Sequence, residues 1–185
     1  VYASAGDGAP VLAVGSEMDI GDYPAGSIGD NYIFTNADFV RVWRDDRQLG
    51  EYRPGGKRWK HLKHPPIPFN DTIGDAIEKG EGWSHRKAEA LKDSLLAIQR
   101  FGVKIPVKYI LKTGLRAVRY LAGPGTFSRL YAKYFENWGT SAPVYRFQAV
   151  KDGKVVAEIS KSSNARLSLS ADASATVLTE GETYD

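Results

Sequence analysis

The chain has 185 residues, of which 42% are hydrophobic and 25% charged, as in an ordinary soluble globular domain. It has no cysteine, which excludes disulfides and thiolate metal sites, and no apolar run long enough to span a bilayer, so we expect no membrane partner. The net charge of +3 is too small to indicate nucleic-acid binding. Because the chain starts at Val1 rather than methionine and has no signal peptide, we expect it to be a piece of a longer protein.

The first 52 residues predict short strands and turns. Pro10–Val14 is an apolar run bounded by turn residues, which favours a strand, and the Gly-, Pro- and Asp-rich run 21–31 favours a loop. Residues 33–52 alternate apolar with polar side chains around Asp45-Asp46, a pair that can turn the chain. This segment therefore predicts a β-hairpin.

The hairpin opens with Thr35-Asn36-Ala37-Asp38, four residues of middling to poor strand propensity. Two interpretations are open. Either these polar side chains bind a ligand, or they form a bend that the fold requires. A structural Asn36 would hydrogen-bond nearby backbone and tolerate an unusual φ.

From residue 53 to 142 the hydrophobic period becomes that of helices. After an irregular stretch and a short helix over 73–79, we expect a helix that Ser84 caps and Gly102 ends. A second helix should begin near Pro106, and a third should run from Thr126 to Trp138. The second helix is expected to use as its apolar stripe Val107, Ile110, Leu111, Val118 and Leu121.

The expected second helix also carries a row of cations. Segment 84–123 has nine Lys or Arg against two acids, so it carries +7 and the rest of the chain −4. The row recurs about every four residues, which places it on one helical face, and consists of Lys104, Lys108, Lys112, Arg116 and Arg119. This face is either solvated or docks an anionic group or acidic partner, and nucleic acid is disfavoured.

After residue 143 the strand pattern returns. Residues 145–149 and 155–159 alternate on either side of Asp152-Gly153, a strong hairpin turn. Residues 166–171 predict another strand, and the last residues begin a further one. We therefore predict a mainly β chain in which short strands form a sandwich and a helical subdomain of about three helices is inserted.

No catalytic residue, metal or cofactor is expected. His61 and His64 have a helical metal-ligand spacing, but two prolines follow and no third ligand is near. Glycoside hydrolysis needs two facing carboxylates. The acids of the first β segment instead lie in or beside turn-rich sequence, where Asp is a turn former, and they are Asp19, Asp22, Asp30 and Asp38.

Trp59 and Trp83 flank the irregular start of the helical segment. Exposed Trp rings stack on sugar faces, so these two are the candidate substrate-binding residues of a carbohydrate platform. The alternative is that both rings cover the join between the insertion and the sandwich.

The segment "FTNADFVRVWRDDRQLGEY" resembles a sequence motif, close to "SNa..VeLfvNGksLG", of glycoside hydrolase family 2 enzymes, the β-galactosidase and β-glucuronidase group. Residues 35–38 match its bend, 40–43 its strand and 48–50 its end, whereas Asp45-Asp46 replaces its Asn-Gly turn. The first 14 residues resemble the chain leaving the catalytic barrel, and residues 145–185 resemble later strands. The helical segment has no counterpart in the best-known members.

The resemblance implies an immunoglobulin-like β-sandwich made of residues 1–52 and 143–185, with the helical insertion at 53–142. It implies a non-catalytic accessory domain of a bacterial enzyme, whose partner is the catalytic barrel of the parent chain and which can shape the substrate entrance. Asn36 is then a structural bend. The bacterial cytoplasm is slightly favoured as the compartment. Two alternatives stay open: an autonomous carbohydrate-binding module that uses Trp59 and Trp83, and a basic helical module for an acidic protein partner.

Overall fold

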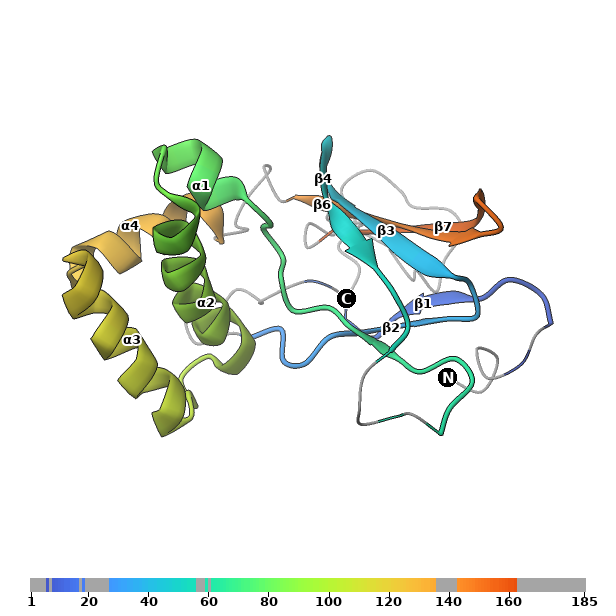
Figure 1. Cartoon of the computed structure of the whole chain (residues 1–185), viewed down its shortest axis with the longest axis horizontal. Coiled ribbons are helices and arrows are strands. Elements are labelled where there is room, and N and C mark those ends of the chain that lie inside the picture. Colours follow the sequence, from blue (N-terminus) through green and yellow to red (C-terminus); the bar gives the residue numbers. More distant parts are fainter. Residues whose placement is uncertain are drawn as a thin grey trace, which may run out of the picture.

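A computed structural model describes residues 6, 8–16, 18, 27–55, 59, 61–135 and 143–162. This part of the chain forms two antiparallel sheets of seven strands in total and four helices, so the fold is mixed α/β rather than mainly β (Figure 1). Figure 1 shows the helices gathered at one end and the sheets at the other. The strands expected after residue 163 and the helix end expected at Trp138 lie outside the described residues.

The first sheet has the order β1-β2-β5. Its strands are β1 (Leu12–Val14), β2 (Tyr32–Thr35) and β5 (Ile67–Pro68). The strand expected at 10–14 is present, but β5 was not foreseen, because two residues are too short to show a strand period. Since β5 pairs with β2 and Phe69 belongs to the buried cluster of the sheets, the chain contributes to the sheet region as far as residue 69. The helical insertion was expected to begin at residue 53.

The second sheet has the order β4-β3-β6-β7. Its strands are β3 (Phe39–Arg44), β4 (Arg47–Tyr52), β6 (Val144–Lys151) and β7 (Lys154–Ser162). Both predicted hairpins are confirmed. Asp45 turns the first at φ 52, and Asp152 and Gly153 turn the second at φ 50 and 74, a left-handed pair typical of tight hairpins.

Side chains of both sheets contribute to one buried cluster. Ile33 of β2 and Ile67 of β5 share it with Val40 and Val42 of β3 and with Phe147 of β6, all at most 2% exposed. Edge-to-face ring contacts extend it, because the Phe69 ring lies 5.2 Å from Tyr52 and 5.5 Å from Phe147, centroid to centroid. The period-two alternation of β3 and β6 thus places the buried residues of the larger sheet on one of its faces, where they join this cluster.

The helices form a second buried cluster. They are α1 (Ala76–Glu81), α2 (His85–Phe101), α3 (Val107–Tyr120) and α4 (Pro124–Tyr134). The limits expected for α2 are confirmed, with Ser84 at its N-cap and Gly102 at its C-cap. The third expected helix begins at Pro124 rather than Thr126, with proline in its first turn. The cluster is built mainly from α1, α2 and α4, through Ile73, Ile77, Leu91, Leu95, Leu130 and Phe135.

The expected orientation of α3 is wrong. None of its residues is buried, and every member of its apolar stripe is at least 55% exposed. The side of α2 that meets α3 carries charge, so α3 turns Arg116 and its tyrosines toward α2, while Lys108, Lys112 and Arg119 stay exposed. There Arg116 pairs with Asp93, and the Tyr109 ring lies 5.2 Å from Phe101. An ion pair and a ring contact thus take the place that aliphatic packing was expected to fill.

Polar contacts join the helices to the larger sheet. Arg44 donates to the carbonyl oxygen of Tyr134 at 2.9 Å, and Arg47 donates to that of Ile73 at 3.0 Å. The buried Tyr145 hydroxyl donates to the carbonyl oxygen of Thr72 at 3.2 Å. These bonds fix the helices against the strands.

Glu81 at the end of α1 ties α1 to α4. Its carboxylate accepts from Arg129 at 2.7 Å and from both Lys133 and the Tyr134 hydroxyl at 2.9 Å. The Arg129 hydrogen bond, followed by the Lys133 hydrogen bond, lowers the pKa of Glu81 from 4.5 to about 2. A folded-state pKa below the unfolded one stabilises the fold above pH 4.5, and this contribution is lost as the pH falls toward 2.

Glu81→Gln should therefore lower the free energy of unfolding at neutral pH by about 1–2 kcal/mol. It should also flatten the acid limb of the stability profile, measured by urea unfolding between pH 2 and 7. Glu51→Gln is the control, because Glu51 makes an exposed pair with Arg41. That change should cost at most about 1 kcal/mol. An acid limb unchanged in Glu81→Gln would contradict the assigned pKa.

Candidate functional site

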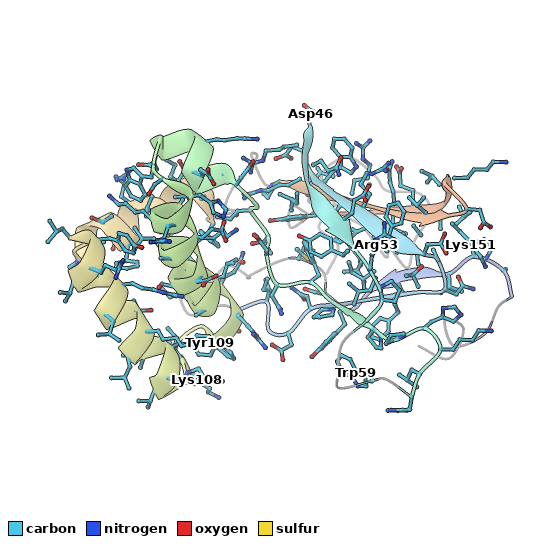
Figure 2. All side chains as sticks on the ribbon, in the orientation of Figure 1. Asp46, Arg53, Trp59, Lys108, Tyr109 and Lys151 are labelled. Atoms are coloured by element: carbon cyan, nitrogen blue, oxygen red, sulfur yellow. The ribbon has the colours of Figure 1, made fainter. Side chains whose placement is uncertain are left out.

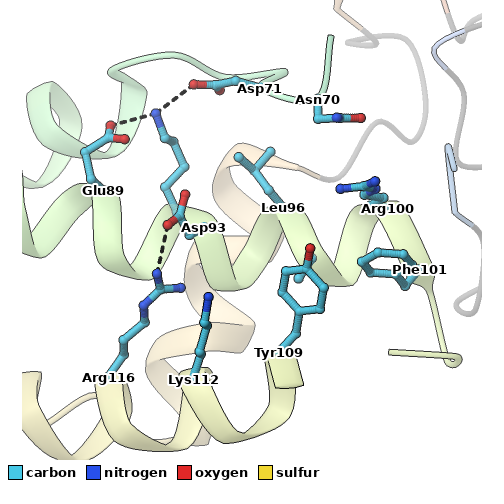
Figure 3. Close-up of a pocket in the computed structure, with 12 residues that line it drawn as sticks. Asn70, Asp71, Glu89, Asp93, Leu96, Arg100, Phe101, Tyr109, Lys112 and Arg116 are labelled. Carbon is cyan, nitrogen blue, oxygen red and sulfur yellow. Dashed lines mark hydrogen bonds and ion pairs between the residues drawn. The ribbon is translucent and has the colours of Figure 1, made fainter. Parts of the chain in front are cut away.

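A pocket of about 340 Å³ lies between α2 and α3 (Figure 3). The loop after β5 contributes Asn70 and Asp71, the outer side of α2 contributes most of the wall, and α3 closes the opposite side. Figure 3 shows Lys112 and Arg116 rising from α3 toward α2. The pocket exists because α3 meets α2 through long polar side chains, which hold the two helices apart.

One wall is organised by Lys92. Its side chain is only 7% exposed, and its ammonium donates to Asp71 at 2.7 Å and to the Gly74 carbonyl oxygen at 3.0 Å, and contacts Glu89 at 2.6 Å. Burial lowers the pKa of Lys92, but the hydrogen bonds to Asp71 and Glu89 outweigh it, so the pKa is raised above 10.5. Lys92 is therefore charged throughout the physiological range.

Asp71 has little capacity left for a ligand. One carboxylate oxygen accepts from the backbone N–H groups of Ile73 and Gly74 at 3.2 and 2.8 Å, and the other accepts from Lys92. This arrangement turns the chain into α1 and aims the carboxylate at α2. Asp71 is thus both a turn residue and the anchor of Lys92.

The opposite wall, on α3, carries two cations, Arg116 and Lys112, which differ in their partners. Arg116 donates to Asp93 at 2.8 Å and to the Ser94 hydroxyl at 3.3 Å. Lys112, one helical turn earlier, lines the pocket, and within the described ranges no hydrogen bond or ion pair joins it to another residue. The aromatic rings of Phe101 and Tyr109 stand at the far end.

This arrangement suits binding better than acid–base chemistry. All three lining carboxylates, Asp71, Glu89 and Asp93, are held in ion pairs. Asp71 and Glu89 both contact the same ammonium, so no sugar ring fits between them. What the pocket offers is the Lys112 ammonium beside two rings and an aliphatic floor, which fits a small molecule carrying one negative charge.

Asn36 lies away from this pocket, in the bend between β2 and β3. It is 3% exposed, and its amide group accepts from the Val11 N–H at 2.9 Å and donates to the carbonyl oxygens of Ala9 and Gly6 at 3.0 and 3.2 Å. Its φ is not positive. The side chain therefore joins the bend to backbone 25 to 30 residues earlier, rather than to the nearby backbone expected from sequence.

Trp59 and Trp83 pack on different parts of the molecule. The Trp59 ring meets Tyr32 of β2 edge-on at 5.3 Å, and Figure 2 shows it below the sheets, away from the helices. Trp83 packs against the helical cluster, with the Lys87 ammonium 3.9 Å from its ring centre. The two rings are not brought together, so they offer no joint sugar platform, and sugar binding by either one stays a prediction.

The three histidines do not come together with other metal-ligating side chains among the described residues. His61 and His64 lie in the loop before β5, and His85 begins α2, where its hydrogen bond to Glu78 at 2.7 Å raises its pKa. Within the described ranges no three His, Asp or Glu side chains gather as a metal site would require. Of the helices described, none has the length and apolar content that a bilayer crossing requires.

Sequence reasoning missed the pocket, although one signal was present. Lys92 falls on the apolar stripe of α2, one residue after Leu91 and three before Leu95, where a solvated lysine has no place. A lysine in that position indicates a buried ion pair. The companion signal on α3 is the spacing of Tyr109, Thr113, Ala117 and Tyr120, which marks the face that meets α2.

No protein-family model matches the chain, and no curated protein matches it.

Proposed function

We propose that this chain is a non-catalytic accessory module of a family 2 β-glycosidase. Its sheets would form an immunoglobulin-like sandwich, and its helices an insertion that carries a binding pocket. The module would buttress the catalytic barrel of the parent chain, and the insertion would help to shape the substrate entrance. The family motif at residues 35–50 and the strand order support this proposal.

The strand order is the observation that supports it most. Immunoglobulin-type sandwiches pair strands A, B and E in one sheet and C, F and G in the other, with D beside E or C′ beside C as edge strands. If the seven strands are assigned in chain order to A, B, C, C′, E, F and G, the two sheets have this composition and this neighbour order. The helices then fall between strands E and F, and the cluster shared by both sheets is the sandwich core.

The family motif fits a structural role on this proposal. Its bend is Thr35 to Asp38, and Asn36 is occupied by three hydrogen bonds to the protein backbone. The Thr35 hydroxyl donates to the Val11 carbonyl oxygen at 2.8 Å, and Asp38 accepts from the Asp152 N–H at 2.8 Å. These polar side chains bind other strands and turns, so they support the bend interpretation over a ligand site.

The purified chain should hydrolyse neither an aryl β-galactoside nor an aryl β-glucuronide, because hydrolysis needs two carboxylates about 5–10 Å apart with the sugar between them. The measurement is the release of nitrophenol, monitored by its absorbance, from a sample that circular dichroism shows to be folded. Turnover that co-elutes with the chain and disappears in Asp71→Asn, Glu89→Gln or Asp93→Asn would reverse the proposal.

A further inference from the structure

The outer face of α3 is an uncovered aliphatic stripe. At 100° per residue its members fall within one broad arc of the helix, turned away from α2. No described residue covers them, although α3 has the most amphipathic sequence of the helices. The stripe consists of the following residues, each given with its exposed fraction: Val107 (69%), Ile110 (55%), Leu111 (65%), Leu115 (73%), Val118 (78%) and Leu121 (92%).

Gly114 lies in the middle of this stripe. Glycine inside a helix costs about 1 kcal/mol relative to alanine. A Cβ at Gly114 would meet no atom within 4 Å, so nothing in the described fold requires a glycine there. Its effect is to leave a notch between Ile110 and Val118, one turn away on either side. A notch of this kind lets the backbone or side chain of a partner approach closely.

Cations border the stripe on one side. Lys108 and Arg119 follow Leu115 around the helix, with Lys112 next, and all three are exposed. No Asp or Glu occurs between residues 94 and 135, so nothing in that segment neutralises this border. Figure 2 shows Lys108 at the end of α3 farthest from the α1 end of the helical cluster.

We propose that this face of α3 docks an amphipathic α-helix of a partner protein, one with an aliphatic stripe bordered by Asp or Glu. The aliphatic stripe supplies the area that a partner helix would bury, and the cationic border selects an acidic flank. A second copy of the chain does not fit, because two copies of α3 would bring only like charges together. The proposal goes beyond the accessory role and does not depend on it.

The stripe distinguishes a protein helix from an anionic lipid surface. Helices that lie in a bilayer interface carry Lys or Arg on the polar face and Trp, Phe or Leu on the apolar face, so the leucines of the stripe alone do not decide between the two. The stripe has no aromatic residue, and the tyrosines of α3, Tyr109 and Tyr120, lie toward α2 rather than in it. A lipid surface gains nothing from the notch at Gly114, whereas a partner helix does.

The test uses two synthetic helical peptides of three heptads with the same leucine stripe, one flanked by glutamate and one by lysine, whose like charges prevent self-pairing. Fluorescence anisotropy should show the glutamate peptide binding the full chain at least about tenfold more tightly than the lysine peptide. The difference should shrink at high salt, because exposed charges are screened. Lys108→Glu/Arg119→Glu should reverse the preference.

Matched variants localise the effect. Leu111→Ser/Val118→Ser should weaken binding at least about tenfold, whereas Val155→Ser, at an exposed valine of β7, should not change it. Gly114→Leu should fill the notch and weaken binding while raising the melting temperature. Equal binding of both peptides, or no binding, overturns the proposal. So does binding of phosphatidylserine vesicles through the stripe without peptide binding, or a dimer that Val118→Ser dissociates.

Discussion

Replacing Lys92 with methionine should lower the free energy of unfolding by about 2–4 kcal/mol. Methionine keeps the apolar stem of the side chain as far as Cε but removes the ammonium that holds Asp71 and Glu89 together. The two carboxylates would then face each other without a cation, and the Gly74 carbonyl oxygen would lose a donor. The loss stays below that of a fully buried pair because these carboxylates are 32% and 37% exposed, so water screens part of the repulsion.

Urea unfolding at neutral pH measures this loss as a shift of the midpoint at constant slope. Because the pKa of Lys92 is raised, its contribution is fully present below 10.5 and is lost only as the pH rises through the folded-state value. Lys108→Met is the matched control at an exposed lysine of α3, and it should change stability by no more than about 0.5 kcal/mol. A Lys92→Met protein as stable as the wild type would show that the ion-pair group does not hold α2 to the loop.

Asn36→Ala should lower the free energy of unfolding by about 2–3 kcal/mol. Loss of a single bond to nearby backbone, as the sequence suggested, would cost only about 1–2 kcal/mol. Three bonds to Val11, Ala9 and Gly6 would be lost instead, at a site that is 3% exposed. The backbone of Gly6 and Ala9 would lose its hydrogen bonds to the bend.

Asp38→Ala is the control within the same bend. Asp38 accepts one exposed hydrogen bond from the Asp152 N–H, so its loss should cost about 0.5–1 kcal/mol. Thermal unfolding followed by circular dichroism compares the two variants. An Asn36→Ala protein with an unchanged melting temperature, or one less destabilised than Asp38→Ala, would contradict the structural role of this side chain.

The elements that sequence predicted are those with a local cause. Alternation and turn chemistry located the two hairpins, and Ser84 and Gly102 marked both ends of α2, because each signal acts within a few residues. β5 escaped prediction because its two residues, Ile67 and Pro68, are too few to show a period, and only its pairing with β2 makes them a strand.

The orientation of α3 could not be predicted from its own sequence. An apolar stripe normally faces the core. Here the cluster of α1, α2 and α4 is already closed, and the free side of α2 offers Asp93 and Phe101 to Arg116 and Tyr109. The pocket could not be predicted either, because its walls come from three segments that are brought together only by the tertiary fold. The partners of Asn36, 25 to 30 residues away, were equally beyond local reasoning.

The accessory-module proposal expects a longer protein that contains this chain and a catalytic barrel, and turnover of aryl β-glycosides by that full-length protein, measured beside the chain alone at equal concentration, tests the proposal most directly. The proposal predicts that the full-length protein hydrolyses at least one aryl β-galactoside or β-glucuronide, while the chain alone releases no nitrophenol above the buffer blank. Absence of any aryl β-glycosidase activity in the folded full-length protein, or activity that resides in the chain itself, would contradict it.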